Sequence, residues 1–412
     1  MFKKKFTDTI NCYQLNNNIV LVNTQNSKWF VINESEYDTY LKVILNNDVE
    51  TSEHKRLTQK DFFVPLENYC NKTLQLYVTN KCNLKCPHCY MRCGQTLDGE
   101  LSLKEKILLI REFCSNGGNK IIFTGGEVLM SPDFYDILLY TRRNTQAYII
   151  VISNGTLWND SLIDSCSPLI DEVQISIDGY SEITNSKIRG KGSFDKSLIT
   201  IEKFISRGTS VVLAMTPLYG FEKEIEQYVS FGKEITQKYK DKKFYFVMSD
   251  GLFQGRQTNW SFSKNLLYAK SSEKILSQVY DNYIDGSFAQ IHSKPLQNCG
   301  YGKIVVDSNG DYTFCTCIKN IPKIGNVRTT SMKHIFEQAN EISQKTCIDN
   351  IEPCKQCDLR YICGNKCRIE FFENTDKISD ISEVSDLKLR FKCNDNYKLQ
   401  ILLKMIDSFD LL

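Results

Sequence analysis

The sequence lacks an excess of charge of either sign, because its 51 Lys and Arg residues nearly cancel its 49 Asp and Glu residues. This balance argues against binding to nucleic acid or to a membrane surface through bulk positive charge. Long apolar runs are also lacking, and stretches such as Tyr148–Ile152 are far shorter than the roughly 20 residues of a membrane helix. Residues 1–12 have a basic start but no apolar stretch of the signal-peptide type. We therefore expect a cytoplasmic protein without nucleic-acid or membrane partners.

Histidine is scarce, with four residues, whereas cysteine is abundant, with 17. The shortage of histidine leaves few ways to build zinc sites of mixed Cys and His ligands. A disulfide framework explains the cysteines poorly, because their number is odd and the chain is long and lacks a secretion signal. Clustered cysteines in such a chain are more often metal ligands or catalytic thiols.

The first of three zones, residues 1–70, predicts a small α+β unit. A helix over Glu34–Leu45 is expected to begin at the N-cap Asn33. Alternating apolar residues before it, separated by Asn-rich turns, predict short strands near Tyr13–Leu15, Ile19–Asn23 and Trp29–Ile32.

Residues 71–250 alternate strand-like and helix-like segments, which predicts repeated βα units around a parallel sheet. Several of the strand candidates are apolar on both faces, as buried parallel strands are. The expected strands are Leu74–Thr79, Lys120–Phe123, Ala147–Ser153, Glu172–Ile177, Val211–Met215 and Phe244–Met248. The expected helices are Leu103–Asn116, Pro132–Arg143, Ser193–Arg207 and Glu222–Tyr239.

A tight cysteine motif, C-x3-C-x2-C, follows the first of these strands at Cys82, Cys86 and Cys89. Three thiolates in one loop can bind three irons of a [4Fe–4S] cluster, which leaves the fourth iron open to a small molecule. The alternatives are three incidental thiols or a zinc loop. A zinc site normally needs four ligands, and His88 lies between two of the cysteines, where the loop is not expected to turn it inward as well.

The cysteine motif resembles that of radical S-adenosylmethionine (SAM) enzymes, with His88 at the position that the family fills with an aromatic residue. Further motifs of that family follow in order at the ends of strands, where α/β barrels place active sites. Each of these motifs alone is also typical of an ordinary turn, and only their joint occurrence in this order favours the family. The residues that the resemblance implies as SAM contacts are Gly125, Gly126 and Glu127 of the GGE motif, Ser153 and Asn154 of the ribose and carboxylate contacts, and Arg189 near the SAM carboxylate.

The resemblance implies a partial (β/α)6 TIM-like barrel over residues 71–250. It also implies that a reduced cluster, supplied with electrons by a donor such as a flavodoxin or ferredoxin, cleaves SAM to methionine and a 5′-deoxyadenosyl radical that abstracts hydrogen. The family often has His-Asp shortly before the arginine, whereas this chain has Asn185 and Ser186 there, which puts any role of that pair in doubt. No catalytic acid or base stands out.

Residues 251–412 lose the strand–helix alternation and hold nine of the 17 cysteines. A C-x2-C block followed by C-x3-C is consistent with a zinc ribbon. Downstream of a radical SAM motif, the pattern resembles a SPASM extension with two auxiliary [4Fe–4S] clusters, three clusters in all. By that resemblance, the outer cluster would bind Cys354, Cys357, Cys363 and Cys393, and the inner cluster Cys299, Cys315 and Cys367.

The three-plus-four division leaves an open iron on the inner cluster, where a substrate thiolate could bind. Cys317 or Cys347 would close that position instead, and the sequence does not decide between these arrangements. The remaining cysteines have no partner spacing and are expected to be ordinary thiols; they are Cys12, Cys70, Cys93, Cys114 and Cys166.

The segment before the barrel resembles the precursor-peptide recognition element of peptide-modifying enzymes, a small winged-helix-like unit that binds a leader peptide as an added strand. The alternative is a packing extension of the barrel. With residues 71–250 as the barrel and 251–412 as a bridging and SPASM region, we expect a radical SAM maturase that crosslinks a ribosomally made precursor peptide, with a thioether favoured. Carbon–carbon or ether crosslinking, formylglycine formation and a non-enzymatic metal scaffold are the alternatives.

Overall fold

The computed structural model describes most of residues 1–250 and parts of residues 251–412. Cys299, Cys317, Cys347, Cys363, Cys367 and Cys393 lie outside the described residues. The described residues are 2–5, 7–26, 28–64, 72–249, 251, 255–258, 261–280, 303–315, 323–345, 352, 354–360 and 394–409.

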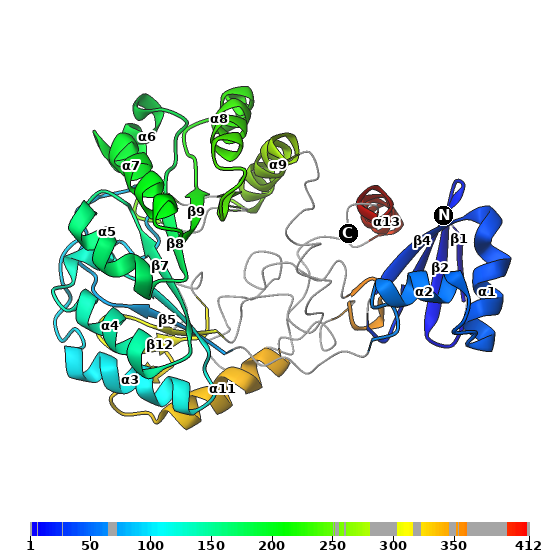
Figure 1. The fold of residues 1–412 in the computed structure, drawn as a ribbon, viewed down its shortest axis with the longest axis horizontal. Coiled ribbons are helices and arrows are strands. Elements are labelled where there is room, and N and C mark those ends of the chain that lie inside the picture. The colour runs from blue at the N-terminus through cyan, green and yellow to red at the C-terminus, as the bar shows by residue number, and fades with distance from the viewer. Residues whose placement is uncertain are drawn as a thin grey trace. The chain divides into compact units, whose positions relative to one another are not determined.

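The chain forms two compact units, each built from separated segments (Figure 1). The first unit comprises residues 1–70, 284–301 and 341–412, and the second comprises residues 71–283 and 302–340. This division differs from the three consecutive zones that the sequence suggests. Parts of residues 251–412 belong to the unit that contains residues 1–70, and other parts belong to the unit that contains residues 71–250.

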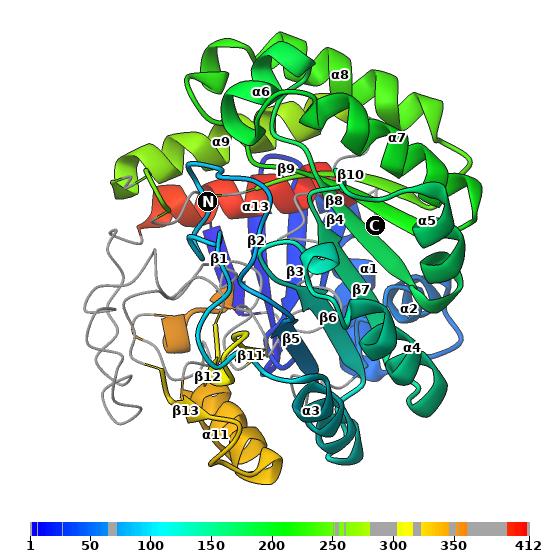
Figure 2. The ribbon, with the colours of Figure 1, turned by 90° about the vertical axis from the view of Figure 1, so that its left-hand side faces the viewer.

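The second unit is built around six parallel strands in sequential order, each hydrogen-bonded to the next (Figure 2). Sequential order distinguishes a curled barrel sheet from a doubly wound sheet, in which the strand order reverses. A partial α/β barrel is therefore confirmed. The strands are β5 (Thr73–Tyr77), β6 (Lys120–Thr124), β7 (Tyr148–Ser153), β8 (Glu172–Ser176), β9 (Ser210–Met215) and β10 (Phe244–Met248).

Helices cover the outer side of these strands (Figures 1 and 2). Strands and helices form where the sequence predicts them because the apolar positions are buried: all five residues of β5 are buried, and Ile110 and Phe113 of α3 are fully buried. The helices are α3 (Leu103–Ser115), α4 (Phe134–Asn144), α5 (Asp160–Cys166), α6 (Glu182–Arg189), α7 (Ser193–Ser206), α8 (Ile225–Lys238) and α9 (Phe262–Val279). The sequence analysis did not anticipate α5 and α6, which are only two turns long.

A segment from the cysteine-rich zone extends the barrel sheet on its other edge. Strand β11 (Ile304–Val306) pairs in parallel with β5, and β12 (Asp311–Thr313) and β13 (Gly325–Asn326) continue antiparallel. Helix α11 (Met332–Lys345) follows, and its Phe336 stacks on Phe113 at 5.5 Å. The beginning of the SPASM region is thus part of the barrel unit.

The first unit contains an antiparallel sheet of four strands in sequential order. One sheet face packs on α1 (Tyr37–Asn46) and α2 (Ser52–Gln59), and the other packs on α13 (Asp395–Ser408) near the end of the chain. The strands are β1 (Phe2–Lys5), β2 (Ile10–Leu15), β3 (Asn18–Asn23) and β4 (Trp29–Asn33). Strand β1 was not anticipated. Asn33 caps a short 3-10 turn, Glu34–Glu36, rather than α1 directly.

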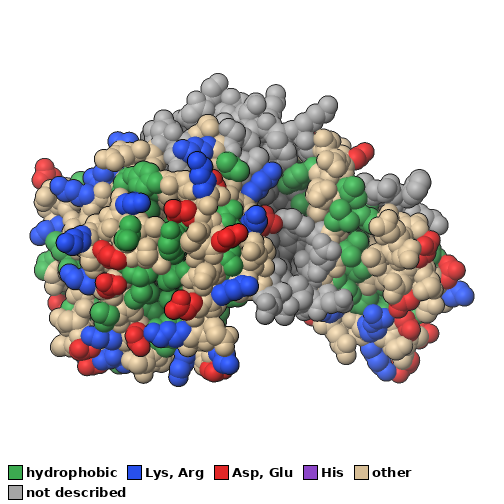
Figure 3. Space-filling model, turned by 90° about the horizontal axis from the view of Figure 1, so that it is seen from above, with side chains coloured by type: hydrophobic (Ala, Val, Ile, Leu, Met, Phe, Trp, Pro, Cys, Tyr) green, Lys and Arg blue, Asp and Glu red, His purple; other side chains and the backbone are tan. Residues whose placement is uncertain are grey.

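The surface agrees with the near-neutral charge of the chain. Figure 3 shows Lys and Arg side chains interspersed with Asp and Glu side chains on the viewed face. No helix in the described part of the chain has the length and apolar character needed to span a membrane.

Candidate active site

A cavity of about 330 Å³ opens beside the carboxyl ends of the parallel strands. This is the end of an α/β barrel at which active sites are found. Side chains from five strand ends and from the loop after β5 line the cavity. Nearly all the residues that the sequence predicts for the SAM-binding cluster and for SAM therefore lie together, although they are spread from residue 82 to residue 189.

The cluster loop, residues 82–94, brings its three cysteines to this cavity. Cys86 starts a tight turn in which the backbone N–H of Cys89 donates to the Cys86 carbonyl oxygen at 3.2 Å, and Pro87 at the second turn position favours this shape. The N–H of Cys82 donates to the carbonyl oxygen of Gly94 at 3.0 Å, which closes the loop at its base. All three cysteines are half-buried.

The three thiols fit an iron–sulfur cluster better than a single ion. Among the described residues, no three His, Cys, Asp or Glu side chains converge on one metal position. A zinc ion needs its ligands around one point, whereas a cube of four irons places each cysteine on a different iron. Burial raises the pKa of the Cys82 thiol to about 11 and also raises the pKa of Cys86. A bound metal centre would favour the thiolate forms, because its positive charge opposes this effect of burial.

The two glycines of the GGE motif lie against the backbone of Thr79 and Lys81, with no room for a side chain. A Cβ on Gly125 would lie 2.6 Å from the carbonyl oxygen of Thr79, and one on Gly126 would lie 2.3 Å from that of Lys81. The N–H of Gly126 donates to Thr79 at 2.8 Å. Both glycines line the cavity, and they are needed because the motif is hydrogen-bonded to the strand end that leads into the cluster loop.

Glu127 lies behind the cavity wall rather than in it. The residue is 1 % exposed, and its carboxylate accepts hydrogen bonds from the Ser153 hydroxyl at 2.7 Å and from the N–H of Asn154 at 2.8 Å. Burial raises its pKa, while these hydrogen bonds act in the opposite direction. Glu127 thus joins the loop after β6 to the loop after β7, and the glycines before it face the cavity.

Ser153 and Asn154, which are predicted to contact SAM, line the cavity. The Asn154 amide also donates to Asn83 Oδ1 at 2.9 Å, and Asn83 donates to Thr156 Oγ1 at 2.9 Å. Asn83 lies between the first two cysteines, so this pair of hydrogen bonds connects the cluster loop to the loop after β7. The sequence analysis missed Asn83, although an amide inside the cysteine motif was a usable signal.

Arg189 lines the cavity from the end of α6 and is held by a buried carboxylate. Its Nε donates to Asp178 Oδ2 at 2.5 Å, and Asp178 is fully buried. Asp178 also accepts from the N–H of Thr216 at 2.9 Å and lies 3.3 Å from His88 Nε2. Burial would lower the pKa of Arg189, but Asp178 raises it, so the guanidinium stays charged.

Asn185, at a position where the resemblance often implies a histidine, has a structural role here. Its Oδ1 accepts from the N–H groups of Asp178 at 2.8 Å and Gly179 at 3.3 Å, and its Nδ2 donates to Ser193 at 2.8 Å. A neutral amide suits this fully buried position because both an acceptor and a donor are required. Ser186 is half-buried, and its hydroxyl donates to the carbonyl oxygen of Ile183 in the same helix at 3.3 Å.

Two tyrosines in the cavity were not anticipated. The hydroxyls of Tyr77 and Tyr90 are 2.5 Å apart, and Gln75 Nε2 donates to Tyr77 at 3.1 Å. Burial, together with Tyr90, raises the pKa of Tyr77 well above its ordinary value, so Tyr77 stays protonated. Cys93 is buried and lines the same cavity, beside the three predicted ligands. The position of Tyr90 directly after Cys89 was the available signal.

The auxiliary cysteines are described only in part. Cys315 follows β12 in the barrel unit, and Cys354 and Cys357 form a turn of the first unit, with the Cys357 N–H donating to the Cys354 carbonyl oxygen at 2.8 Å. The other four predicted ligands lie outside the described residues, so the auxiliary ligand sets stay a prediction.

Comparison with known proteins agrees with this geometry. Residues 76–232 match the model of the radical SAM superfamily, and residues 298–358 match that of the SPASM iron–sulfur cluster-binding domain. The chain therefore contains a radical SAM domain and a SPASM domain. The first match spans the strand ends, the cluster loop and Arg189, and the second begins just before the strands that extend the barrel sheet.

SkfB, a sporulation killing factor maturation protein of Bacillus subtilis, is 35% identical to this chain over 158 residues, which is 37% of each chain. AlbA of the same organism, an antilisterial bacteriocin subtilosin biosynthesis protein, is 26% identical over 63% of this chain and 58% of its own. The chain thus spans between about a third and three-fifths of these relatives. The structure of Streptococcus suis SuiB bound to precursor peptide SuiA shares the fold, with a TM-score of 0.53, 15% identity and coverage of 90% and 96%.

Proposed function

We propose that this protein is a radical SAM maturase that abstracts hydrogen from a ribosomally made precursor peptide and installs a crosslink. The observation that carries the proposal is the convergence of Cys82, Cys86, Cys89 and Arg189 on one cavity at the strand ends. The names of SkfB, AlbA and SuiB, which refer to maturation, bacteriocin biosynthesis and a precursor peptide, support a peptide as the substrate.

The residues of the cavity have separate tasks in this proposal. Cys82, Cys86 and Cys89 bind the cluster, which supplies the electron for cleavage of SAM and hence the radical that abstracts hydrogen. The Arg189 guanidinium pairs with the SAM carboxylate, and Asp178 holds it in place from behind. The backbone of Gly125 and Gly126 and the side chains of Ser153 and Asn154 position the rest of SAM. The cavity walls exclude water from the reacting atoms.

The first unit is proposed to bind the leader of the precursor. Its sheet has two edge strands, β1 and β4, each hydrogen-bonded to a neighbour on one side. An extended peptide can pair with such an edge through main-chain hydrogen bonds. The apolar side chains of both sheet faces are already covered by helices, which leaves the edges as the binding surface.

The proposed crosslink is a thioether between a cysteine sulfur and a peptide carbon. It is supported by the expected ligand count of four cysteines for the outer auxiliary cluster and three for the inner one. Cys299, Cys315 and Cys367 would hold the inner cluster, which would supply an iron site for a thiolate and an acceptor for one electron. The substrate thiol loses its proton, and one electron is left over for this acceptor when the sulfur–carbon bond forms. The substrate then loses two hydrogen atoms for each bond, one to the radical and one as a proton.

The test is to incubate the anaerobically reconstituted enzyme with SAM, a reductant and the precursor peptide encoded beside it. Thioether formation predicts a loss of mass equal to two hydrogen atoms per modification and resistance of the modified cysteines to alkylation. A peptide that never loses this mass contradicts the proposal. Modification of a cysteine-free precursor would indicate carbon–carbon or ether crosslinking, and an aldehyde product would indicate formylglycine formation.

Metal analysis separates catalysis from a scaffold. Three [4Fe–4S] clusters predict about twelve irons per chain, together with cleavage of SAM. Stoichiometric zinc without SAM cleavage would indicate a non-enzymatic metal-binding protein. The electron donor, proposed to be a flavodoxin or ferredoxin, is identified by replacing the chemical reductant in the same assay.

A further inference from the structure

A short segment downstream of β10 packs against the cluster loop. This clamp segment, Gly255–Gln257, follows the sixth parallel strand and lies more than 160 residues from the cysteines in sequence. The N–H of Gly255 donates to the carbonyl oxygen of Thr258 at 2.8 Å, which folds the segment into a narrow turn. Neither the cysteine motif nor the SAM motifs include it.

Arg256 and Gln257 bind backbone oxygens of the cluster loop. Arg256 Nε donates to the carbonyl oxygen of Cys86 at 3.4 Å, and a second nitrogen of the same guanidinium donates to that of Cys93. The N–H of Gln257 donates to the carbonyl oxygen of Pro87 at 2.8 Å. These contacts connect the backbone of the Cys86 turn to that of Cys93, and one of them is made to the backbone of a predicted iron ligand, Cys86.

The opposite contact comes from the cluster loop itself. Arg92 donates to the carbonyl oxygen of Gly255 at 3.5 Å, so each segment supplies an arginine to the backbone of the other. Arg92 has a φ of +50°, a left-handed conformation that is unfavourable for residues with a Cβ. The loop thus holds a strained residue next to its contact with the clamp segment.

The two segments approach so closely that only glycine fits at their contact. A Cβ on Gly255 would lie 2.4 Å from Thr258 Oγ1, and 2.7 Å and 2.8 Å from the backbone C and Cα of His88, which lies between the second and third cysteines. The Thr258 side chain can turn away, but the His88 contacts are to backbone atoms, so the loop would have to move to admit a side chain. The position of Gly255 therefore depends on the position of the cysteine turn.

We propose that Arg256 is a positioning residue for the SAM-binding cluster. Its planar fork joins the carbonyl groups of Cys86 and Cys93, and thereby fixes the turn from which Cys86 and Cys89 reach their irons. Its positive charge next to these backbone dipoles favours the reduced, more negative cluster. Groups behind metal ligands commonly set the affinity and the electronic properties of the metal centre.

The experiment compares full-length, reconstituted wild-type enzyme with Arg256→Met, Arg256→Lys and Gly255→Ala. Arg143→Ala is the matched control, because Arg143 lies exposed on α4 in the same unit. The readouts are the rate at which a chelator removes iron, the midpoint potential of the cluster whose electron paramagnetic resonance signal changes on addition of SAM, and the circular dichroism of each variant. None of these readouts requires a peptide, so failure of the maturase proposal would leave them unaffected.

Arg256→Met is expected to release the iron of the SAM-responsive cluster about tenfold faster than the wild-type enzyme and to have a lower midpoint potential. Arg256→Lys keeps the charge but loses the fork, so its iron loss should be fast while its potential stays near that of the wild-type enzyme. Gly255→Ala should lose iron as Arg256→Met does. Equal iron loss and equal potentials in Arg256→Met, Arg143→Ala and wild type would overturn the proposal. So would a general loss of folded structure in Arg256→Lys, because that result indicates a purely structural residue.

Discussion

At the scale of single residues, the site depends on side-chain contacts that the sequence motifs do not reveal. Asp178 is the clearest case, because one buried carboxylate contacts Arg189, the Thr216 backbone and His88. A charge without exposure to water must be paired to be tolerated. Asp178 therefore connects the residue proposed for the SAM carboxylate to the cluster loop.

Asp178→Asn is expected to lower the free energy of unfolding by about 3 kcal/mol, since it leaves the buried Arg189 guanidinium without its counter-charge. SAM affinity should fall about tenfold, because the arginine loses the contact that orients it. Calorimetry with SAM and chemical unfolding measure the two effects. Asp195→Asn removes the same charge from an exposed position on α7 and should change neither quantity. Unaltered SAM binding in Asp178→Asn would contradict the assigned role.

Gly126→Ala tests the close approach of the GGE motif to the cluster loop. The added Cβ would lie 2.3 Å from the Lys81 carbonyl oxygen, so the backbone before Cys82 must move. We expect a loss of about 1–3 kcal/mol in stability, and iron content lower by about one cluster. Gly94→Ala is the control, because Gly94 lies in the cluster loop itself and nothing lies within 4 Å of its added Cβ. Equal iron content in the two variants would refute this reason for the glycine.

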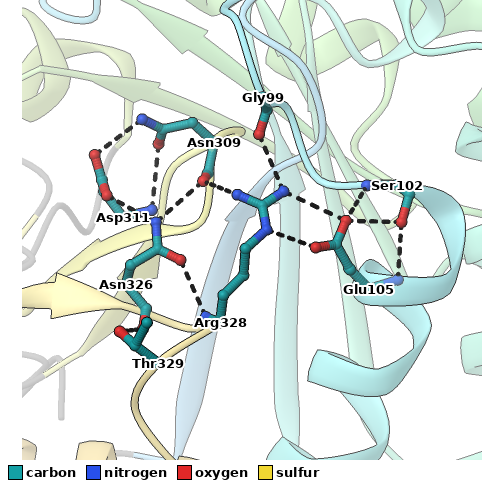
Figure 4. A network of polar contacts seen from close by, with 8 residues as sticks. All are labelled: Gly99, Ser102, Glu105, Asn309, Asp311, Asn326, Arg328 and Thr329. Atoms are coloured by element: carbon teal, nitrogen blue, oxygen red, sulfur yellow. Dashed lines mark hydrogen bonds and ion pairs between the residues drawn. The ribbon is translucent and has the colours of Figure 1, made fainter.

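At the scale of elements, Arg328 connects the segment that contains β11, β12 and β13 to the start of α3 (Figure 4). Its guanidinium donates to Glu105 Oε1 at 2.5 Å and to the carbonyl oxygens of Asn309 at 2.8 Å and Gly99 at 3.1 Å. Glu105 also accepts from the N–H of Ser102 at 2.8 Å, which caps α3. The Arg328 side chain thus joins three segments: the loop at Gly99, the start of α3 at Glu105, and the turn at Asn309 between β11 and β12.

Glu105→Gln should weaken this attachment. The hydrogen bond from Arg328 is the main reason that the pKa of Glu105 is lowered to about 2. A lowered carboxyl pKa adds stability above the ordinary value of 4.5, and this stability is lost as the pH falls toward 2. Because both side chains are about one-third exposed, we expect a difference of only about 1 kcal/mol at neutral pH. Unfolding of the apo-protein measures it, and the difference should shrink below pH 4.5.

Glu112→Gln provides the comparison for Glu105→Gln, because Glu112 lies on the same helix. It should unfold like the wild-type protein at every pH. A pH-independent difference for Glu105→Gln would show that the ionised carboxylate is not the source of the effect.

At the scale of the whole molecule, the ends of the sequence belong to one unit. Leu402 and Met405 of α13 are fully buried against Tyr13, Val20 and other side chains of the N-terminal sheet. The Tyr13 hydroxyl also donates to Asp358 at 2.5 Å. The small sheet is therefore completed by residues more than 300 positions away, and the proposed leader-binding unit is not an independent N-terminal domain.

Leu402→Ala is expected to destabilise the first unit by about 2–5 kcal/mol, because it leaves a cavity in this core. Leader-peptide binding should weaken, while SAM binding by the barrel unit should persist. Fluorescence anisotropy of a labelled leader and calorimetry with SAM measure the two activities separately. Gln400→Ala, on the exposed side of the same helix, should affect neither. Loss of SAM binding in Leu402→Ala would contradict the division into two units.

Local residue patterns were enough to predict the barrel fold and the radical SAM and SPASM domains of this protein. The spacing of Cys82, Cys86 and Cys89 and the order of the motifs up to Arg189 identified the superfamily, because a metal cluster and a parallel barrel both impose short-range constraints on sequence. Apolar runs likewise placed all six barrel strands within a few residues. The patterns could not show that Asp178 holds Arg189, that Arg256 binds the cluster loop, or that α13 completes the first sheet. Each of these contacts joins segments distant along the chain, and hydrogen bonding and burial between distant segments leave no periodic signal in one sequence.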